Sequence, residues 1–226
     1  TADEGELKLL RGDVVKALLE EYYAKKDEKF QKFVECFATG KSDENLGELV
    51  QKLYEMAMSN PFPEEWLREC LTDYKIESLE ELRNTEWMKM LWAAVTDELQ
   101  EAELLIQEAR NVCVEADGPY LYEDALNSDL LFVRSLKELA GKKDYDGTVK
   151  ALMKPAFARL STKKAPEVDE QKKQRVKDLR EEEKGILKEL GQRYFQSTET
   201  EILEVIRYIR GPIEMLVELT ARFKKQ

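Results

Sequence analysis

The sequence of 226 residues contains no histidine. Histidine is the usual general base of enzymes, a common zinc ligand, and the partner of the nucleophile in Ser-His and Cys-His catalytic sites. Its absence removes all of these arrangements together. Most enzyme mechanisms are therefore excluded for this chain before any motif is considered.

Cysteine is scarce, and its spacing carries no motif. Cys36, Cys70 and Cys113 are three in number, they lie 34 and 43 residues apart, and no two of them form a CxxC pair. An odd, widely spaced set argues against both a disulfide framework and a thiolate metal site. We expect reduced thiols in the core.

Long apolar runs are also lacking. No stretch approaches the 18 or more residues that a membrane span needs, and no charged-then-apolar leader resembles a signal peptide. We therefore expect no membrane contact and a cytoplasmic location. The chain begins at Thr1, and helical periodicity starts within the first ten residues. This beginning predicts a piece cut from a longer protein.

A phosphate-binding loop of the form GxxxxGK[ST] is missing as well. Gly40 to Ser42 read GKS, but the residue five positions before Gly40 is Glu35, so the glycine that opens such a loop is absent. The acidic run Glu181 to Glu183 could in principle hold Mg²⁺, yet consecutive carboxylates on a helix point in different directions. We predict no catalytic residue, cofactor or metal site in this chain, and no enzymatic activity of its own.

The residues that are present favour helices. With 42% hydrophobic and 37% charged residues, ten Gly and six Pro, the composition is that of a globular chain. Apolar residues recur at intervals of three and four, without sustained two-residue alternation. We predict an all-α fold: one irregular multi-helix domain over residues 1–226 with long antiparallel helices. The expected helices cover about 3–24, 30–37, 43–58, 63–71, 84–116, 120–140, 148–153, 168–195 and 202–223.

Two of these helices carry further expectations. Apolar positions are sparse over residues 168–195, which predicts a helix that projects from the body or lies on its surface. The last helix should kink at Arg210 to Pro212.

Most aromatic residues, including the three tryptophans and the pair Tyr22 and Tyr23, are spaced as core residues rather than as base-stacking platforms. Tyr120 and Tyr122, after Gly118, are less easily assigned to the core.

One stretch reverses the charge of the chain. Residues 159–180 carry a net charge of +4, whereas the other 204 residues sum to −15. Mixed charge on a helix is usually only a solvated face. Here an exposed connection, a sparse apolar face and an acidic remainder occur together, which favours attraction of a phosphate backbone to one place. The candidate DNA-binding residues are Arg159, Lys163, Lys164, Lys172, Lys173, Arg175, Lys177 and Arg180.

Several strings resemble one known family. They are ADEGELKLLRGDVVKALLEEYY, LGELVQKLYEMAMSNPFPEEWL, ADGPYLYEDAL, FARLSTKKAPEVDEQKKQRVKDLREE, RYF and LVELTARF. Their order and spacing resemble part of the AddA family, the large helicase and nuclease subunits of Gram-positive bacteria. The resemblance extends over essentially the whole chain.

The resemblance implies a place in a larger machine. In that family the region is a helical accessory insertion, subdomain 1B, between the nucleotide-binding loop and the acidic Mg²⁺ motif of a superfamily 1 motor. It implies that the parent protein uses ATP and Mg²⁺ and acts with an AddB partner. It also implies unwinding and exonucleolytic digestion of duplex ends during recombinational repair of double-strand breaks. The alternative is a protein-docking module, packed on the motor domains or the AddB-like partner without touching DNA.

Overall fold

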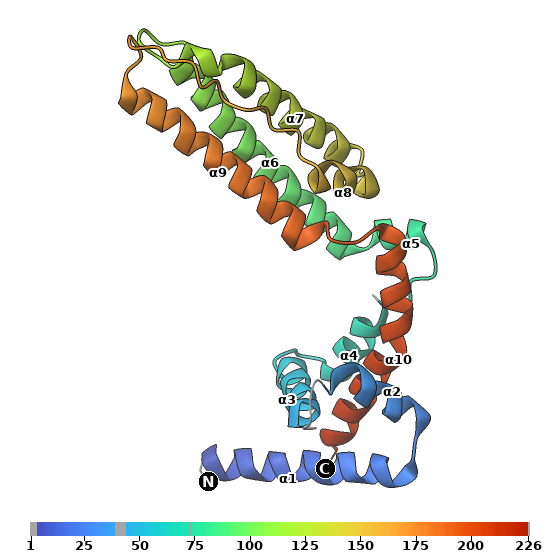
Figure 1. Ribbon diagram of the computed structural model, residues 1–226. Coiled ribbons are helices and arrows are strands. Elements are labelled where there is room, and N and C mark those ends of the chain that lie inside the picture. Colours follow the sequence, from blue (N-terminus) through green and yellow to red (C-terminus); the bar gives the residue numbers. More distant parts are fainter. Residues whose placement is uncertain (1–3, 39–43, 73, 226) are drawn as a thin grey trace. The chain divides into compact units, whose positions relative to one another are not determined.

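The computed structural model describes residues 4–38, 44–72 and 74–225, and all regular structure in them is helical (Figure 1). The all-α prediction is confirmed. The elements are α1 (Glu4–Lys25), α2 (Glu28–Phe37), α3 (Glu44–Met58), α4 (Pro63–Thr72), α5 (Leu79–Asn84), α6 (Glu86–Cys113), the 3₁₀ helix η1 (Tyr120–Tyr122), α7 (Glu123–Gly141), α8 (Tyr145–Met153), α9 (Glu170–Tyr194) and α10 (Glu199–Phe223).

Contacts divide the chain into two compact units. Unit 1 comprises residues 1–82 and 203–226, and unit 2 comprises residues 83–202. Each unit has its own buried apolar core. The GKS sequence at 40–42 and the predicted caps of α3 at Ser42 or Asp43 lie outside the described residues.

Unit 1 is built around aromatic and aliphatic side chains from α1, α2, α3 and the later turns of α10. Phe33, Leu46 and Leu219 are fully buried in this core. The side chain of Asp27 caps α2 by accepting hydrogen bonds from the backbone N–H groups of the second and third helical residues. Pro63 opens α4 as predicted, since its missing N–H costs nothing in the first turn.

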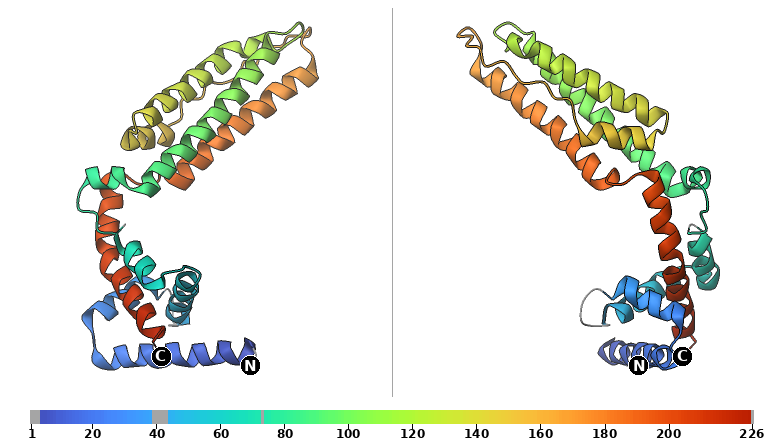
Figure 2. Two further views of the ribbon diagram at one scale, coloured as in Figure 1. Left: turned by 180° about the vertical axis from the view of Figure 1, so that it is seen from behind. Right: turned by 45° about the vertical axis from the view of Figure 1, so that its right-hand side comes forward.

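Unit 2 is a bundle of three long helices, α6, α7 and α9 (Figure 2). The chain reverses after α6 at Gly118, where a Cβ atom would lie 2.4 Å from the carbonyl oxygen of Val112, so only glycine fits. Helix α7 therefore returns antiparallel to α6. Helix α9 also runs antiparallel to α6, because Arg175 near its start contacts Glu108 and Arg193 near its end contacts Glu98. The predicted long antiparallel helices are confirmed.

The expectation that the helix over 168–195 would project or lie on the surface is wrong. Helix α9 packs more extensively on α6 than any other pair of helices among the described residues. Val176, Leu179, Leu187 and Leu190 are all buried. The gap between Leu179 and Leu187, which made the apolar face look sparse, is filled by two charged residues that are themselves buried.

Between α8 and α9 the chain is not helical. This segment, residues 154–168, is called the strap, and it follows α9 in the opposite direction. The carbonyl oxygen of Ala158 accepts a hydrogen bond from Arg180, and the ring of Phe157 lies 5.4 Å from Lys184 Nζ. The strap ends where the N–H of Asp169 donates to the carbonyl oxygen of Asp117 at 2.8 Å.

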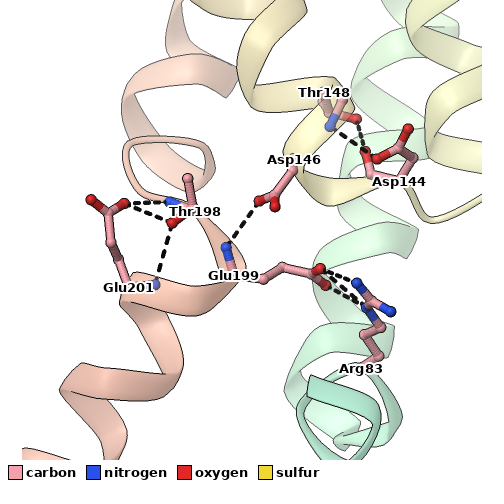
Figure 3. Close-up of polar contacts among 8 residues, drawn as sticks. Arg83, Asp144, Asp146, Thr148, Thr198, Glu199 and Glu201 are labelled. Atoms are coloured by element: carbon pink, nitrogen blue, oxygen red, sulfur yellow. Dashed lines mark hydrogen bonds and ion pairs between the residues drawn. The ribbon is translucent and has the colours of Figure 1, made fainter. Parts of the chain in front are cut away.

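Polar contacts connect Arg83, at the start of unit 2, with Glu199 at the start of α10, and Glu199 with Asp146 on α8 (Figure 3). Glu199 is buried and receives two hydrogen bonds from Arg83 Nε and one from Arg83 Nη2, while its own N–H donates to Asp146 at 3.0 Å. Thr198 and Glu201 form a reciprocal capping box at the start of α10. Because each carboxylate there already has a partner, this network is structural.

Other expectations about the core are largely confirmed. Cys36, Cys70 and Cys113 form no disulfide bond with one another; Cys113 is buried and the other two are half-buried. Trp92 and Tyr22 belong to the cores, whereas Tyr23, which was predicted to be a core residue as well, is 41% exposed. The two tyrosines of the turn divide: Tyr122 is buried, whereas Tyr120 is half exposed and donates a hydrogen bond to Glu167.

Candidate nucleic-acid interface

Helix α9 carries a row of lysines on one side. Lys173, Lys177, Lys184 and Lys188 are spaced by four, seven and four residues, which places them within about 60° of one another around the helix axis. Lys177 and Lys188 make no ion pair with the described residues, whereas Lys173 is paired with Glu170 and Lys184 with Glu181.

The strap lies along this same side of α9. Phe157 stands beside Lys184, and one surface hollow brings Lys163 of the strap together with Lys173 of the helix. The strap adds its own cations, all of them exposed. We call the resulting surface the cationic strip: Lys154, Arg159, Lys163, Lys164, Lys173, Lys177, Lys184 and Lys188.

Four of the eight residues predicted from the sequence are already neutralised. Lys172 Nζ lies 2.7 Å from Asp117 and 3.0 Å from Glu115. These carboxylates raise the pKa of Lys172 above its usual value, Asp117 by the larger amount. Lys173 pairs with Glu170 at 2.8 Å, and Arg175 with Glu108 at 2.6 Å. A phosphate would have to displace a carboxylate to reach any of them.

Arg180 is the clearest departure from the predicted site. Its residue is only 4% exposed, and its guanidinium binds Asp129, with 2.5 Å between Nε and Oδ2. Arg180 therefore faces the interior of unit 2 and is not a surface contact for DNA. The four remaining predicted residues make no ion pair with the described part of the chain: Arg159, Lys163, Lys164 and Lys177.

Sequence reasoning missed three members of the strip, Lys154, Lys184 and Lys188. The charge count stopped at Arg180, because the acidic run that follows cancels the surplus along the sequence. The spacing of four, seven and four from Lys173 to Lys188 was the signal that could have found the lysines of α9, since it is a helical period.

A groove opens beside the strip, with a volume of about 480 Å³. Leu152, Phe157, Leu187 and Phe195 supply apolar surface, and Lys184 and Lys188 stand among its lining residues. Gly191 presents bare helix backbone to the same groove. The groove therefore combines an apolar floor with positive charge.

Beneath the strip lies a buried carboxyl group without a partner. Glu183 on α9 is fully buried, and neither of its oxygen atoms has a hydrogen-bond partner among the described residues. Burial, followed by the nearby charge of Asp129, raises the pKa of Glu183 to about 8. Glu183 therefore holds its proton at neutral pH and adds no negative charge to α9.

The described residues hold no group of three or more Cys, Asp or Glu side chains placed to bind a metal ion. Glu181 pairs with Lys184 one turn further along α9, whereas Glu183 is buried in the core, so the acidic run diverges as expected for a helix. None of the described helices is long and apolar enough to cross a membrane.

The sequence of the chain was compared with those of known proteins. No family model matches the chain. Curated relatives do match it. The ATP-dependent helicase/nuclease AddA of Lachnoclostridium phytofermentans is 38% identical over 224 residues, which cover 98% of this chain and 16% of the relative. The chain is homologous to a segment of AddA.

AddA proteins from other bacteria give the same result. The protein of Clostridium perfringens strain 13 is 34% identical over 202 residues, covering 87% of this chain and 16% of its own length. That of Anoxybacillus flavithermus is 30% identical over 224 residues, covering 98% of this chain and 18% of its own length. The chain thus spans about one sixth of the length of the AddA proteins that it matches, and the resemblance found in the sequence is confirmed.

Proposed function

We propose that residues 1–226 form a non-catalytic accessory domain, of the 1B type, in an ATP-dependent helicase/nuclease of the AddA family. Its role is to hold DNA near the unwinding junction by contacts with phosphates that do not depend on base sequence. The observation that carries this proposal is the cationic strip on unit 2, where eight cations line one side of α9 and the strap and only Lys173 and Lys184 among them pair with a carboxylate of the described residues.

The wider setting of the proposal comes from the relatives. Their name describes a helicase and a nuclease that depend on ATP. We infer that the parent protein binds ATP and Mg²⁺ elsewhere in its chain, works with an AddB-like partner, and acts in the cytoplasm in repair of double-strand breaks by recombination. The partners of this domain are then DNA and the motor domains of the same chain.

The arrangement of charge suits contact with a backbone rather than with bases. From Lys177 to Lys188 the row extends about 16 Å along α9, at about 1.5 Å of rise per residue. Lysine ammonium groups act as point charges on flexible stems, and phosphate contacts carry no direct sequence information. A translocating enzyme needs this kind of grip, because it must release every sequence that it passes.

Charge reversal tests the proposal. Lys163 on the strap and Lys188 on α9 are both exposed and have no ion-pair partner in the described chain, so their replacement should leave the fold intact. We expect Lys163→Glu/Lys188→Glu to weaken binding of a forked DNA about tenfold or more at about 0.1 M salt, where the Debye length is about 10 Å, because two attractive contacts become repulsive. Fluorescence anisotropy of a labelled fork measures the change.

A matched control separates the strip from the net charge. Lys32 on α2 and Lys142 after α7 are exposed cations outside the strip, and Lys32→Glu/Lys142→Glu changes the net charge by the same amount. This variant should bind DNA within about threefold of the original chain, since distant charges are largely screened. An equal loss in both variants would show that only net charge matters, against the proposal.

A second candidate function is docking on protein. Leu9 and Leu10 on α1 are 73% and 60% exposed, and Phe62 before α4 is 69% exposed. Exposed apolar side chains of this size suit contact with the motor domains or with an AddB-like partner. Absence of DNA binding at every salt concentration would favour this role over the strip.

A further inference from the structure

We propose that the groove beside the strip binds one unpaired nucleotide, with its base in the apolar part and its phosphate near Lys184 and Lys188. The inference rests on the proposed contact with DNA and goes further: it makes an unpaired strand, not only duplex phosphates, a ligand of unit 2. The proposal is based on three features that line the same groove: apolar side chains, two lysines, and the exposed backbone at Gly191.

The groove has the properties of a small-ligand site. Its volume of about 480 Å³ falls within the range of about 300–1,000 Å³ that is typical of such sites. Phe157, which is half-buried, and Met153, which is exposed, give it an apolar lining of the kind that can cover the face of a base. Proteins that bind single strands combine such surfaces with a positively charged path for the backbone.

The charges around the groove select an anionic occupant. Lys188 is exposed without an ion-pair partner in the described chain, and Lys184 is 5.4 Å from the ring of Phe157. Glu181 is the carboxylate that pairs with Lys184, at 2.9 Å. The cationic strip leads from this groove along α9, so a strand with one base seated here has phosphate-binding side chains along its onward path.

Gly191 offers a way to fill the groove without disturbing the fold. A Cβ atom at this position would have its nearest neighbour, Leu152 Cβ, at 3.7 Å, which is ordinary contact. A leucine there would extend into the groove, and it would favour the helix relative to glycine. Gly185, on the same helix, has nothing within 4 Å of its would-be Cβ atom and does not line the groove, so Gly185→Leu is the matched control.

The experiment compares Gly191→Leu, Gly185→Leu and the original chain. Anisotropy is measured with a short oligothymidylate, with a blunt duplex, and with an abasic oligonucleotide that has the same number of phosphates. Gly191→Leu should weaken oligothymidylate binding about tenfold, the effect of losing one stacked base, and leave duplex binding within about twofold. Gly185→Leu should change neither affinity.

The abasic strand gives a second test that needs no protein variant. The original chain should bind it about tenfold more weakly than oligothymidylate, and Gly191→Leu should remove this preference. Equal affinity of the original chain for both strands, or oligothymidylate binding unchanged by Gly191→Leu, would overturn the nucleotide site while duplex binding still supported the strip. Failure of the original chain to bind any DNA at low salt would overturn both proposals.

Discussion

At the scale of single residues, the most unusual side chain is that of Glu183. A carboxyl group that is fully buried and makes no hydrogen bond with the described residues incurs a desolvation cost when it ionises. Its neighbour Arg180 is already engaged by Asp129, and that carboxylate further disfavours a second negative charge. The proton on Glu183 is therefore part of the packing of unit 2.

The titration of Glu183 predicts how stability depends on pH. The pKa of Glu183 is about 8 in the folded chain, against 4.5 for an ordinary glutamate, which stands for the unfolded chain. At any pH between these two values, unfolding therefore releases a proton from Glu183. Stability should therefore fall as pH rises from about 4.5 to about 8, and Glu183→Gln should remove this part of the slope. The variant should gain up to a few kcal/mol over the original chain at pH 8 and much less at pH 5, because one pKa unit corresponds to about 1.4 kcal/mol.

Urea unfolding at several pH values measures this effect. Glu182→Gln is the control, because the neighbouring side chain is exposed and its replacement removes the same formal charge. The control should follow the pH dependence of the original chain. If Glu183→Gln did the same, Glu183 would be ionised in the folded protein, and the argument from burial would be wrong.

At the scale of elements, one arginine joins α7, α9 and the strap. Arg180 on α9 binds Asp129 on α7 and donates a hydrogen bond to the carbonyl oxygen of Ala158 in the strap. The three elements therefore share one buried guanidinium. These contacts explain why the buried position 180, in the middle of α9, is occupied by an arginine and not by an apolar residue.

Arg180→Met tests this assignment. The variant leaves Asp129 buried without its partner, so we expect a loss of about 3–5 kcal/mol in the free energy of unfolding. Arg175→Met, which removes the exposed pair with Glu108, should cost about 1 kcal/mol or less. Trypsin should also cut Arg180→Met faster at Lys163 and Lys164, because the strap loses an attachment. Similar losses in the two variants would contradict the special role of Arg180.

The same arginine shows how far sequence reasoning reached. Periodicity located the longer helices to within a few residues but missed the short helix α5. The break at Gly118 and the start at Pro63 follow from local geometry that any chain must obey. The start of α8 was missed by three residues, because Asp144 caps it from outside the apolar pattern, with Gly147 N–H donating to Asp144 Oδ1 at 2.9 Å. Local patterns predict local structure well.

Long-range pairing was beyond those patterns. The partner of Arg180 lies 51 residues away, and that of Arg175 lies 67 residues away. A count of charges along the sequence treats all eight predicted residues alike, although one is buried and three face carboxylates of other turns or helices. Of the eight predicted residues, the four that make no ion pair with the described residues are Arg159, Lys163 and Lys164, which are exposed, and Lys177, which is half-buried.

At the scale of the whole molecule, a small cationic surface stands on an acidic chain. Of the net charge of −11, residues 1–82 with 203–226 carry −7 and residues 83–202 carry −4. Acidic surface repels DNA, whereas the strip attracts it, so the field favours one place and one orientation of contact. The isolated chain should accordingly bind DNA weakly, and in a manner that depends on salt.

The salt dependence can be given a range. Six residues of the strip make no ion pair with the described residues, and contact of about four phosphates predicts that log K for duplex DNA falls with log salt at a slope of about −3.6. Six contacts would give about −5.4, at about −0.9 for each. Screening of the acidic surface by the same salt works in the opposite direction and keeps the slope from becoming steeper.

Anisotropy titrations of a blunt duplex between low and physiological salt measure this slope. A slope near zero would mean that phosphates are not neutralised on binding, and a slope well beyond about −5.4 would require cations outside the strip.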